Sequence, residues 1–104
     1  MALPRRGEVW LVDLGMTAKV RPCLVCSIPV QDEHRALVTL VPHTTSVRGS
    51  RFEVVIPVKF LRAGAFDAQN IVTNPYAKLI RKLGTLTQSQ LTLIDDSLRL
   101  WLGL

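Results

Sequence analysis

Apolar and polar residues alternate or form short runs along most of the chain, and this pattern predicts strands. Residues 7–13 are rich in β-branched and aromatic side chains and lie between Gly7 and Gly15. Residues 22–28 form an almost unbroken apolar run, which is typical of a central strand covered on both faces. Pro57, near the end of another run, favours an edge or terminal position. The predicted strands cover residues 7–13, 22–28, 35–41, 52–58, 68–73 and 77–82.

Polar segments and turn-forming residues mark the connections between these strands. Residues 14–20 are expected to form a short loop that carries Lys19. Residues 29–33 turn the chain, and residues 43–51 form a polar, flexible loop. Residues 59–64 are expected to form a turn or one short helical turn. The connections are therefore short, as expected for neighbouring antiparallel strands.

The end of the chain has a helical period instead. Thr87 and Gln90 form a T-x-x-Q pattern, which predicts a capping box at a helix start. Leu93 and Leu100 lie off the main apolar stripe, so the helix is apolar over more than one face. The residues at helical spacing in that stripe are Leu91, Ile94, Leu98, Trp101 and Leu102.

Strands followed by one terminal helix indicate a mainly β (α+β) protein, a small barrel or bent antiparallel sheet of five to seven strands closed by the C-terminal α-helix. The 104 residues are enough for one core, so we predict a single domain over residues 1–104. No run approaches the roughly 20 apolar residues of a membrane span, and the N-terminus has no apolar signal segment. We therefore expect a cytoplasmic protein that does not associate with membranes.

The net charge of +5 is unevenly distributed. The last eighteen residues contain Asp95, Asp96 and Arg99, so the remainder has 13 − 1 = 12 basic and 8 − 2 = 6 acidic residues, or +6. A basic body favours a polyanionic partner, of which nucleic acid is the commonest. The alternative is a surface charged for solubility alone.

Cys23 and Cys26 form a C-x-x-C pair, a spacing found in redox and zinc sites. Both lie in the predicted strand 22–28, where residues three apart point to opposite faces. The two thiols are therefore not expected to share a metal or a relaxed disulfide, and no second Cys/His pair completes a zinc site. We expect two small core residues and no metal.

Two segments at strand–loop boundaries carry groups suited to phosphate chemistry. One is RPCLV at residues 21–25, with a permanently charged, forked guanidinium beside a rigid proline. The other is VPHTTS at residues 41–46, with a cluster of hydroxyls. Together with RGEVWLVD at residues 6–13, they resemble the MazF/PemK family of toxins from bacterial toxin–antitoxin pairs. The resemblance runs from about residue 5 to the C-terminus, with its parts in the family's order.

This resemblance implies a fold and an activity. The fold is an SH3-like barrel, shared with the related gyrase poison CcdB. The activity is a sequence-specific, metal-independent endoribonuclease that needs no cofactor, cleaves single-stranded mRNA to a 2′,3′-cyclic phosphate and a 5′-hydroxyl, and inhibits growth. The partners implied are single-stranded RNA, a cognate acidic antitoxin and a second copy in a homodimer.

The resemblance places the catalytic arginine at Arg21, in the R-P motif, and the catalytic threonine at Thr44, the first hydroxyl of the P-x-T motif. A fixed guanidinium fork is suited to neutralise the phosphate oxygens in the transition state. Thr44 is suited to bond a phosphate oxygen or to orient the nucleophile. The alternatives are a surface ion pair of Arg21 with Glu8 or Asp67, and a plain turn hydroxyl for Thr44.

Substrate contacts are expected from the first strand, from the loops that flank Arg21 and Thr44, and from the amide of Gln69, which can read a base edge. For Glu8, placement at the surface remains the alternative to a supporting role. The residues expected to bind substrate are Glu8, Lys19, Thr45, Ser46, Arg48, Arg51 and Gln69.

The general base stays open. His43 is a usual choice of residue type, but its side chain should point away from that of Thr44 on an extended backbone. Some PemK-type proteins carry an R-C-D-Q segment with acid–base residues; the corresponding stretch here is FDAQN at residues 66–70, where only Gln69 matches and Asp67 is offset by one.

Two other functions remain as alternatives. The basic charge fits a non-catalytic SH3-like nucleic-acid-binding module, or an inactive toxin, equally well. A CcdB-type gyrase poison gives no reason for two phosphate-oriented loops around Arg21 and Thr44.

Overall fold

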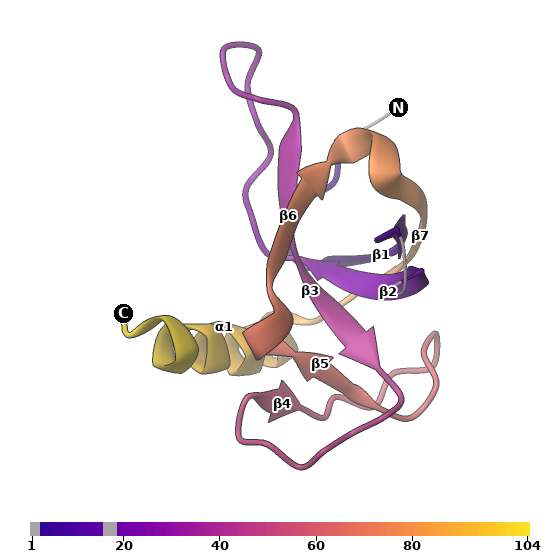
Figure 1. The fold of residues 1–104 in the computed structure, drawn as a ribbon, viewed down its shortest axis with the longest axis vertical. Helices are drawn as coiled ribbons and strands as arrows, with labels where there is room; N and C mark the ends of the chain where they lie inside the picture. Colours follow the sequence, from indigo (N-terminus) through magenta and orange to yellow (C-terminus); the bar gives the residue numbers. More distant parts are fainter. Residues whose placement is uncertain (1–2, 16–18) are drawn as a thin grey trace.

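The computed structural model describes residues 3–15 and 19–104, and within them the chain forms a bent antiparallel sheet with one long helix (Figure 1). Residues 16–18 of the predicted 14–20 loop lie outside the described residues. The strands are β1 (Glu8–Asp13), β2 (Val20–Val25), β3 (Leu37–Thr44), β4 (Glu53–Val54), β5 (Ala65–Asp67), β6 (Val72–Pro75) and β7 (Leu79–Thr85). Two 3₁₀ turns, η2 (Ala68–Asn70) and η3 (Tyr76–Lys78), precede the helix α1 (Gln88–Leu102).

The sheet has the order β4-β5-β3-β2-β1-β7, with β6 also paired to β3. On one edge, β3 pairs with β6 over Leu37 to Leu40 and then with β5 over His43 and Thr44. Pro42 lies between the two pairings, where its lack of an N–H costs no ladder hydrogen bond on that edge. Among the described residues no pairing joins β4 to β7, so the fold is the bent open sheet rather than a closed barrel.

Two apolar clusters cover the two faces of the sheet. Alternate residues of one strand enter different clusters, as the two-residue period of a strand requires. The helix-side cluster contains Val9, Leu24, Val41, Ile56, Phe66, Ala68, Leu86, Leu91, Ile94 and Leu98. The opposite-side cluster contains Trp10, Val12, Cys23, Val25, Val38, Leu40 and Leu79.

The thiols confirm this alternation. Cys23 belongs to the opposite-side cluster, whereas Cys26 packs against the helix-side cluster. Burial raises the pKa of Cys23 to about 12 and that of Cys26 to about 11. Both groups are therefore protonated thiols at neutral pH, packed as the small core residues that the sequence predicts.

The sequence prediction is wrong in detail between residues 52 and 75. The strand predicted over 52–58 shrinks to β4; Val55 beyond it is 61% exposed, and Pro57 has no N–H to donate to a ladder. The strand predicted over 68–73 is replaced by η2 and β6. Asp67 accepts a hydrogen bond from the backbone N–H of Gln69 (3.2 Å), and this local bond tightens the chain into a 3₁₀ turn.

The capping box of α1 is confirmed. The Gln90 N–H donates to Oγ1 of Thr87 (3.2 Å), and the Thr87 N–H donates to the Gln90 side chain (2.9 Å). The helix ends at Gly103, whose positive φ of 73° suits glycine. No helix among residues 3–15 and 19–104 combines the length and the apolarity needed to cross a membrane.

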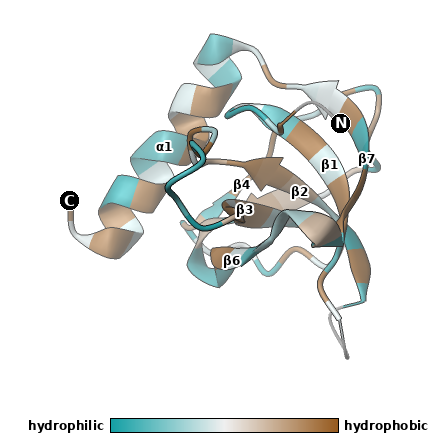
Figure 2. Cartoon of the chain, turned by 90° about the horizontal axis from the view of Figure 1, so that it is seen from above, coloured by the Kyte–Doolittle hydropathy of each residue, from teal (hydrophilic) through white to brown (hydrophobic). Residues whose placement is uncertain are grey.

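The apolar stripe of α1 is buried only in its first part. Leu91, Ile94 and Leu98 are core residues, but Trp101 and Leu102 are 42% and 50% exposed. Trp101 instead makes an edge contact with Phe52, with ring centroids 5.3 Å apart. Figure 2 shows apolar residues distributed along the helix and not confined to the side that faces the sheet.

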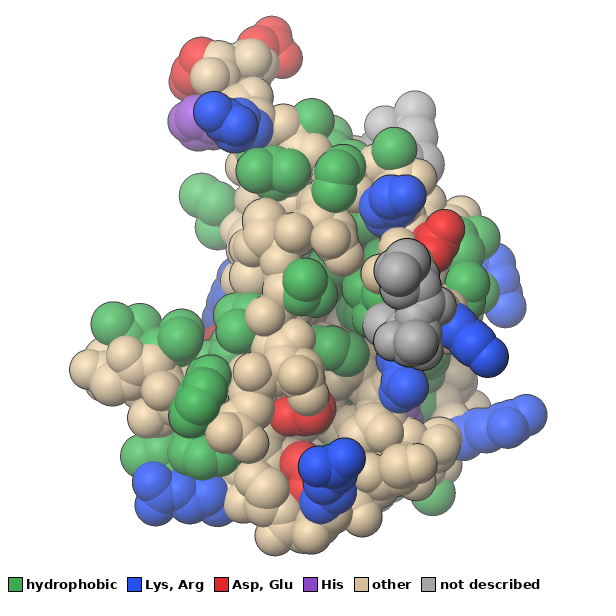
Figure 3. Space-filling view, in the orientation of Figure 1, with side chains coloured by type: hydrophobic (Ala, Val, Ile, Leu, Met, Phe, Trp, Pro, Cys, Tyr) green, Lys and Arg blue, Asp and Glu red, His purple; other side chains and the backbone are tan. Residues whose placement is uncertain are grey.

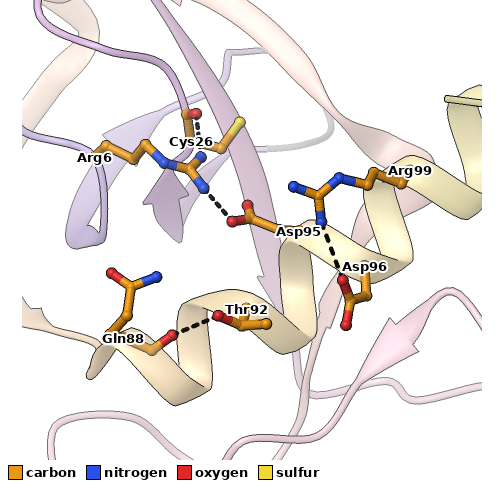
Figure 4. A network of polar contacts seen from close by, with 7 residues as sticks. All are labelled: Arg6, Cys26, Gln88, Thr92, Asp95, Asp96 and Arg99. Carbon is orange, nitrogen blue, oxygen red and sulfur yellow. Dashed lines mark hydrogen bonds and ion pairs between the residues drawn. The ribbon is translucent and has the colours of Figure 1, made fainter.

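Arg6 fixes the helix to the sheet. One guanidinium nitrogen donates to the carbonyl of Cys26 (2.7 Å), just after β2, and another forms an ion pair with Asp95 of α1 (Figure 4). These bonds join three segments that are distant in the sequence, so they fix the end of β2 against the helix.

Candidate active-site cleft

A cleft of about 700 Å³ opens between the start of β2, the end of β3, the 45–52 loop, and the β5–η2–β6 segment. It collects polar and charged side chains from parts of the chain that are far apart in sequence. On the face seen in Figure 3, acidic and basic side chains lie next to one another over β4 and β5. The lining residues are Leu14, Arg21, Pro42, Thr44, Ser46, Arg48, Ser50, Glu53, Asp67, Gln69, Asn70, Val72 and Asn74.

The pairing of β2 with β3 brings Arg21 and Thr44 together. In this pairing Cys23 lies opposite Pro42, and the next pairs follow the same register. Continuing the register two residues toward the cleft places Arg21 opposite Thr44. Residues opposite one another in an antiparallel pair share a face, and here both side chains line the cleft. The R-P and P-x-T motifs therefore meet because of the sheet register.

Thr44 has a fixed hydroxyl. Its Oγ1 accepts a hydrogen bond from the backbone N–H of Ser46 (3.0 Å). Since that bond uses an acceptor site of the oxygen, the hydroxyl hydrogen is available to donate toward the cleft. Thr44 is the last residue of β3, so a rigid strand positions it rather than the loop in which the sequence analysis placed it.

Two carboxylates share the cleft with two guanidinium groups. Glu53 and Asp67 lie directly opposite one another where β4 pairs with β5. Asp67 accepts from the N–H of Gln69 (3.2 Å) and from the side-chain amide of Asn70 (2.5 Å). The cleft therefore combines cationic groups suited to a phosphate with two carboxylates.

Three of the predicted substrate contacts, Ser46, Arg48 and Gln69, line the cleft. The other four lie outside the lining residues of the described chain: Glu8, Lys19, Thr45 and Arg51. Lys19 is exposed with a positive φ of 55°, two residues before Arg21. The Arg51 guanidinium lies over the Phe52 ring, 5.1 Å from its centroid. Thr45 is exposed.

Glu8 lies at the start of β1, opposite Thr85 of β7. It accepts hydrogen bonds from the Arg5 N–H (2.9 Å) and the Trp10 indole N–H (3.0 Å), and it forms an ion pair with Lys82 (3.1 Å). Burial raises the pKa of Glu8, but these hydrogen bonds and the Lys82 charge together lower it. Glu8 thus links β1 to β7, and neither it nor its partners belong to the cleft.

His43 points away from the cleft, as the alternation along β3 predicts. It is 4% exposed, and its ring packs edge-on against Phe66 with centroids 5.0 Å apart. Burial lowers the pKa of His43, so the imidazole is neutral and serves as a core residue.

Lowering the pH should therefore destabilise the protein through His43. Its folded-state pKa lies below the unfolded value of about 6.5, so between these values only the unfolded state binds the proton. The contribution of the neutral His43 imidazole to stability is complete above about pH 6.5 and falls as the pH drops toward the folded-state pKa. We expect the fall in Tm between pH 7.5 and pH 5.5 to shrink in His43→Leu.

The exposed His34 provides the control for this measurement. His34→Gln should keep the full fall in Tm, because His34 is half exposed and contributes no buried imidazole. A fall in Tm that is unchanged in His43→Leu would show that another group causes the pH dependence.

Sequence reasoning missed Glu53, Ser50, Asn70 and Asn74 as cleft residues. It also missed Gly64, which lies beside the end of β3 that carries Thr44. A Cβ at Gly64 would lie 2.1 Å from the carbonyl oxygen of Thr44. No local pattern signals this contact, because it arises from tertiary packing. The signal available for Glu53 was its position two residues after the end of the predicted 43–51 loop, at the start of a predicted strand.

Comparisons with known proteins agree with this geometry. The sequence model of the PemK-like, MazF-like toxin of type II toxin–antitoxin systems matches residues 5–102. The probable endoribonuclease MazF5 of Mycobacterium tuberculosis (strain ATCC 25618 / H37Rv) is 33% identical over 104 residues, covering 93% of this chain and 91% of the relative.

Solved structures show the same fold. An endoribonuclease in complex with its cognate antitoxin from mycobacterial species superposes with a TM-score of 0.83 at 32% identity, covering 97% of this chain and 96% of that chain. MazF (Form-I) from Deinococcus radiodurans superposes with a TM-score of 0.84 at 23% identity over the whole of both chains. By sequence and by fold, this chain belongs to the family of PemK-like, MazF-like toxins of type II toxin–antitoxin systems.

Proposed function

We propose that this protein is a metal-independent endoribonuclease toxin that cuts single-stranded mRNA at a short preferred sequence and thereby inhibits growth. The observation that carries the proposal is the placement of Arg21 and Thr44 on paired strands that line one cleft. The names of the relatives support it, since MazF5 and the mycobacterial proteins are described as endoribonucleases.

The proposed reaction is attack of the ribose 2′-hydroxyl on the adjacent phosphorus. The O2′–P bond forms and the P–O5′ bond breaks, which leaves a 2′,3′-cyclic phosphate and a 5′-hydroxyl. Arg21 binds the phosphate oxygens through two parallel N–H donors as charge develops on them. Thr44, whose hydroxyl is oriented by the Ser46 N–H, donates to a phosphate oxygen.

Two proton transfers complete this reaction. The 2′-hydroxyl proton goes to a base, and the departing O5′ receives a proton. Among the lining residues the carboxylate of Asp67 is able to accept a proton, whereas both oxygens of Glu53 accept N–H bonds from the 45–52 loop and His43 is turned into the core. We therefore assign the acid–base chemistry to groups in the cleft and not to the imidazole of His43.

The same cleft is proposed to bind the RNA backbone and one base edge. Arg48 and Ser46 extend the cationic and hydroxyl surface beyond Arg21, and Gln69 offers a donor and an acceptor at the η2 side. A single strand is preferred because the base must be splayed out to align its 2′-hydroxyl with the phosphorus.

We further propose a homodimer in the cytoplasm that is neutralised by an acidic antitoxin. The structure of a relative in complex with its cognate antitoxin supports the antitoxin as a partner. The exposed apolar residues of α1 and of the end of the chain support the homodimer, because exposed apolar surfaces often mark a protein–protein interface. These residues are Leu93, Leu100, Trp101, Leu102 and Leu104, between 42% and 86% exposed.

The proposed activity predicts discrete cleavage of a long single-stranded RNA in the presence of EDTA. The purified protein should leave 5′-hydroxyl and 2′,3′-cyclic phosphate ends at a recurring short sequence, because the cleft residues supply the charge neutralisation themselves. Mapping both ends by sequencing checks the products. Intact RNA that is nevertheless retarded in a gel would indicate a non-catalytic binding module. Cleavage that stops in EDTA and returns with a divalent ion would contradict the metal-independent mechanism.

A further inference from the structure

The 45–52 loop forms one wall of the cleft although it has no regular secondary structure. Residues 45–49 are all exposed, so burial does not hold the loop in place. Nevertheless, it presents Ser46, Arg48 and Ser50 to the cleft. A segment of this kind needs other bonds to keep its side chains in position.

The carboxylate of Glu53 supplies these bonds. The backbone N–H of Arg48 donates to both of its oxygens, at 3.1 and 3.0 Å, and the N–H of Ser50 donates to Oε1 at 2.7 Å. In return, the Glu53 N–H donates to the Ser50 carbonyl (3.1 Å). These hydrogen bonds lower the pKa of Glu53, so the carboxylate stays ionised at neutral pH.

Glu53 is itself anchored to the sheet. It lies in β4 opposite Asp67, and the neighbouring Ala68 N–H donates to the Phe52 carbonyl (3.0 Å). At its other end the loop is attached to Thr44 through the bond from the Ser46 N–H to Oγ1. The loop therefore runs between two fixed points, one at the end of β3 and the other at Glu53.

The negative charge of Glu53 allows its effect on the loop to be distinguished from its direct effect on RNA binding. A carboxylate in a cleft for RNA repels the phosphates, so on electrostatic grounds alone it weakens substrate binding. Its bonds to the loop backbone act in the opposite direction, because they hold the guanidinium of Arg48 at the cleft. If the Glu53 charge is removed, KM should therefore fall where repulsion dominates and rise where the bonds to the loop dominate.

We propose that Glu53 is a positioning residue for substrate binding, which holds the 48–50 segment so that Arg48 contacts the RNA backbone. The inference rests on the proposed endoribonuclease activity. Glu53 acts through Arg48 and makes no bond to the reacting phosphate. Arg21 and Thr44 stand on strands, and the Ser46 N–H that orients the Thr44 hydroxyl lies at the other end of the loop, outside the bonds of Glu53.

The test measures cleavage of a short synthetic RNA that contains a site cut by the wild-type protein. Glu53→Ala should raise KM about tenfold and leave kcat within about twofold, because the phosphate clamp is untouched while the charge-assisted bonds to the loop are lost. Asp32→Ala removes the same charge from an exposed turn that does not line the cleft, and should change neither constant. A lowered KM in Glu53→Ala would show that simple repulsion dominates and would overturn the proposal.

Two further measurements separate positioning from general stability. Arg48→Ala should itself raise KM, and Glu53→Ala should add little to it in the double variant, since the first residue acts through the second. Hydrogen exchange of the Arg48 and Ser50 amides should be faster in Glu53→Ala, while Tm and the exchange of β3 remain unchanged. Additive effects, or unchanged amide exchange, would contradict the inference.

The exchange measurement also distinguishes this inference from the proposed function. If the wild-type protein cuts no RNA but the amides are still released in Glu53→Ala, the endoribonuclease proposal fails while the bond between Glu53 and the loop stands. If the wild-type protein cuts RNA and both KM and amide exchange are unaffected in Glu53→Ala, only the positioning role fails.

Discussion

Arg21→Lys should cut RNA about a hundredfold more slowly than the wild-type protein, corresponding to roughly 3 kcal/mol of lost transition-state stabilisation. Lysine keeps the positive charge but is a single point donor, so it cannot make two parallel bonds to the phosphate oxygens. The effect should fall on kcat, because those bonds strengthen as charge develops in the transition state. Single-turnover cleavage with saturating enzyme measures it.

The folded state should survive this change. Arg21 is only partly buried at the cleft end of β2, so Tm should stay close to the wild-type value. Arg48→Lys provides the matched control, because it makes the same chemical change on the exposed loop of the cleft. It should mainly affect KM. Cleavage by Arg21→Lys at the wild-type rate would show that Arg21 is not the phosphate clamp.

Gly64→Ala should destabilise the protein by about 1–3 kcal/mol and also reduce RNA cleavage. The added Cβ would lie 2.1 Å from the carbonyl oxygen of Thr44 and 2.7 Å from a ring carbon of His43. The first contact is with backbone, which cannot move aside as the end of a flexible side chain can. The strand end that carries the Thr44 hydroxyl must shift instead. Urea unfolding measures the stability, and cleavage well below the unfolding midpoint measures the activity.

Two comparison variants separate the parts of this effect. Ala63→Ser changes the exposed neighbouring residue and should alter neither stability nor cleavage. Thr44→Ala removes the hydroxyl without moving the backbone, so it should reduce cleavage and leave the unfolding midpoint almost unchanged. A Gly64→Ala protein as stable and active as the wild type would mean that the backbone relaxes without cost to the site.

The sequence predicted the parts of this fold that local rules control. The capping box at Thr87 depends on residues three apart, and the opposite directions of His43 and Thr44 depend on neighbouring residues in one strand. Likewise, the opposite faces of Cys23 and Cys26 depend only on the strand period. In each case the physical cause lies within a few residues, so a single sequence is sufficient to show it.

The parts that failed depend on contacts between distant segments. The strand predicted over 68–73 was wrong because the Asp67 side chain forms a turn there, and β5 was missed because its apolar pattern is only three residues long. Glu53 was missed as a cleft residue because its place opposite Asp67 is set by pairing across a connection without regular structure. Strand register of this kind cannot be derived from residue spacing.

The exchange of partners along β3 has a consequence for the RNA preference of the proposed enzyme. Arg21 and Thr44 lie on the paired strands β2 and β3, whereas the surrounding walls are the 45–52 loop and the η2–β6 segment on the other edge of β3. Connections at a surface tolerate changes of length and composition far better than paired strands do. A substitution or insertion in either wall can therefore reshape the recognised bases without displacing the reaction centre. In the proposed enzyme, the segments that would set selectivity are therefore distinct from the strands that hold the reacting groups.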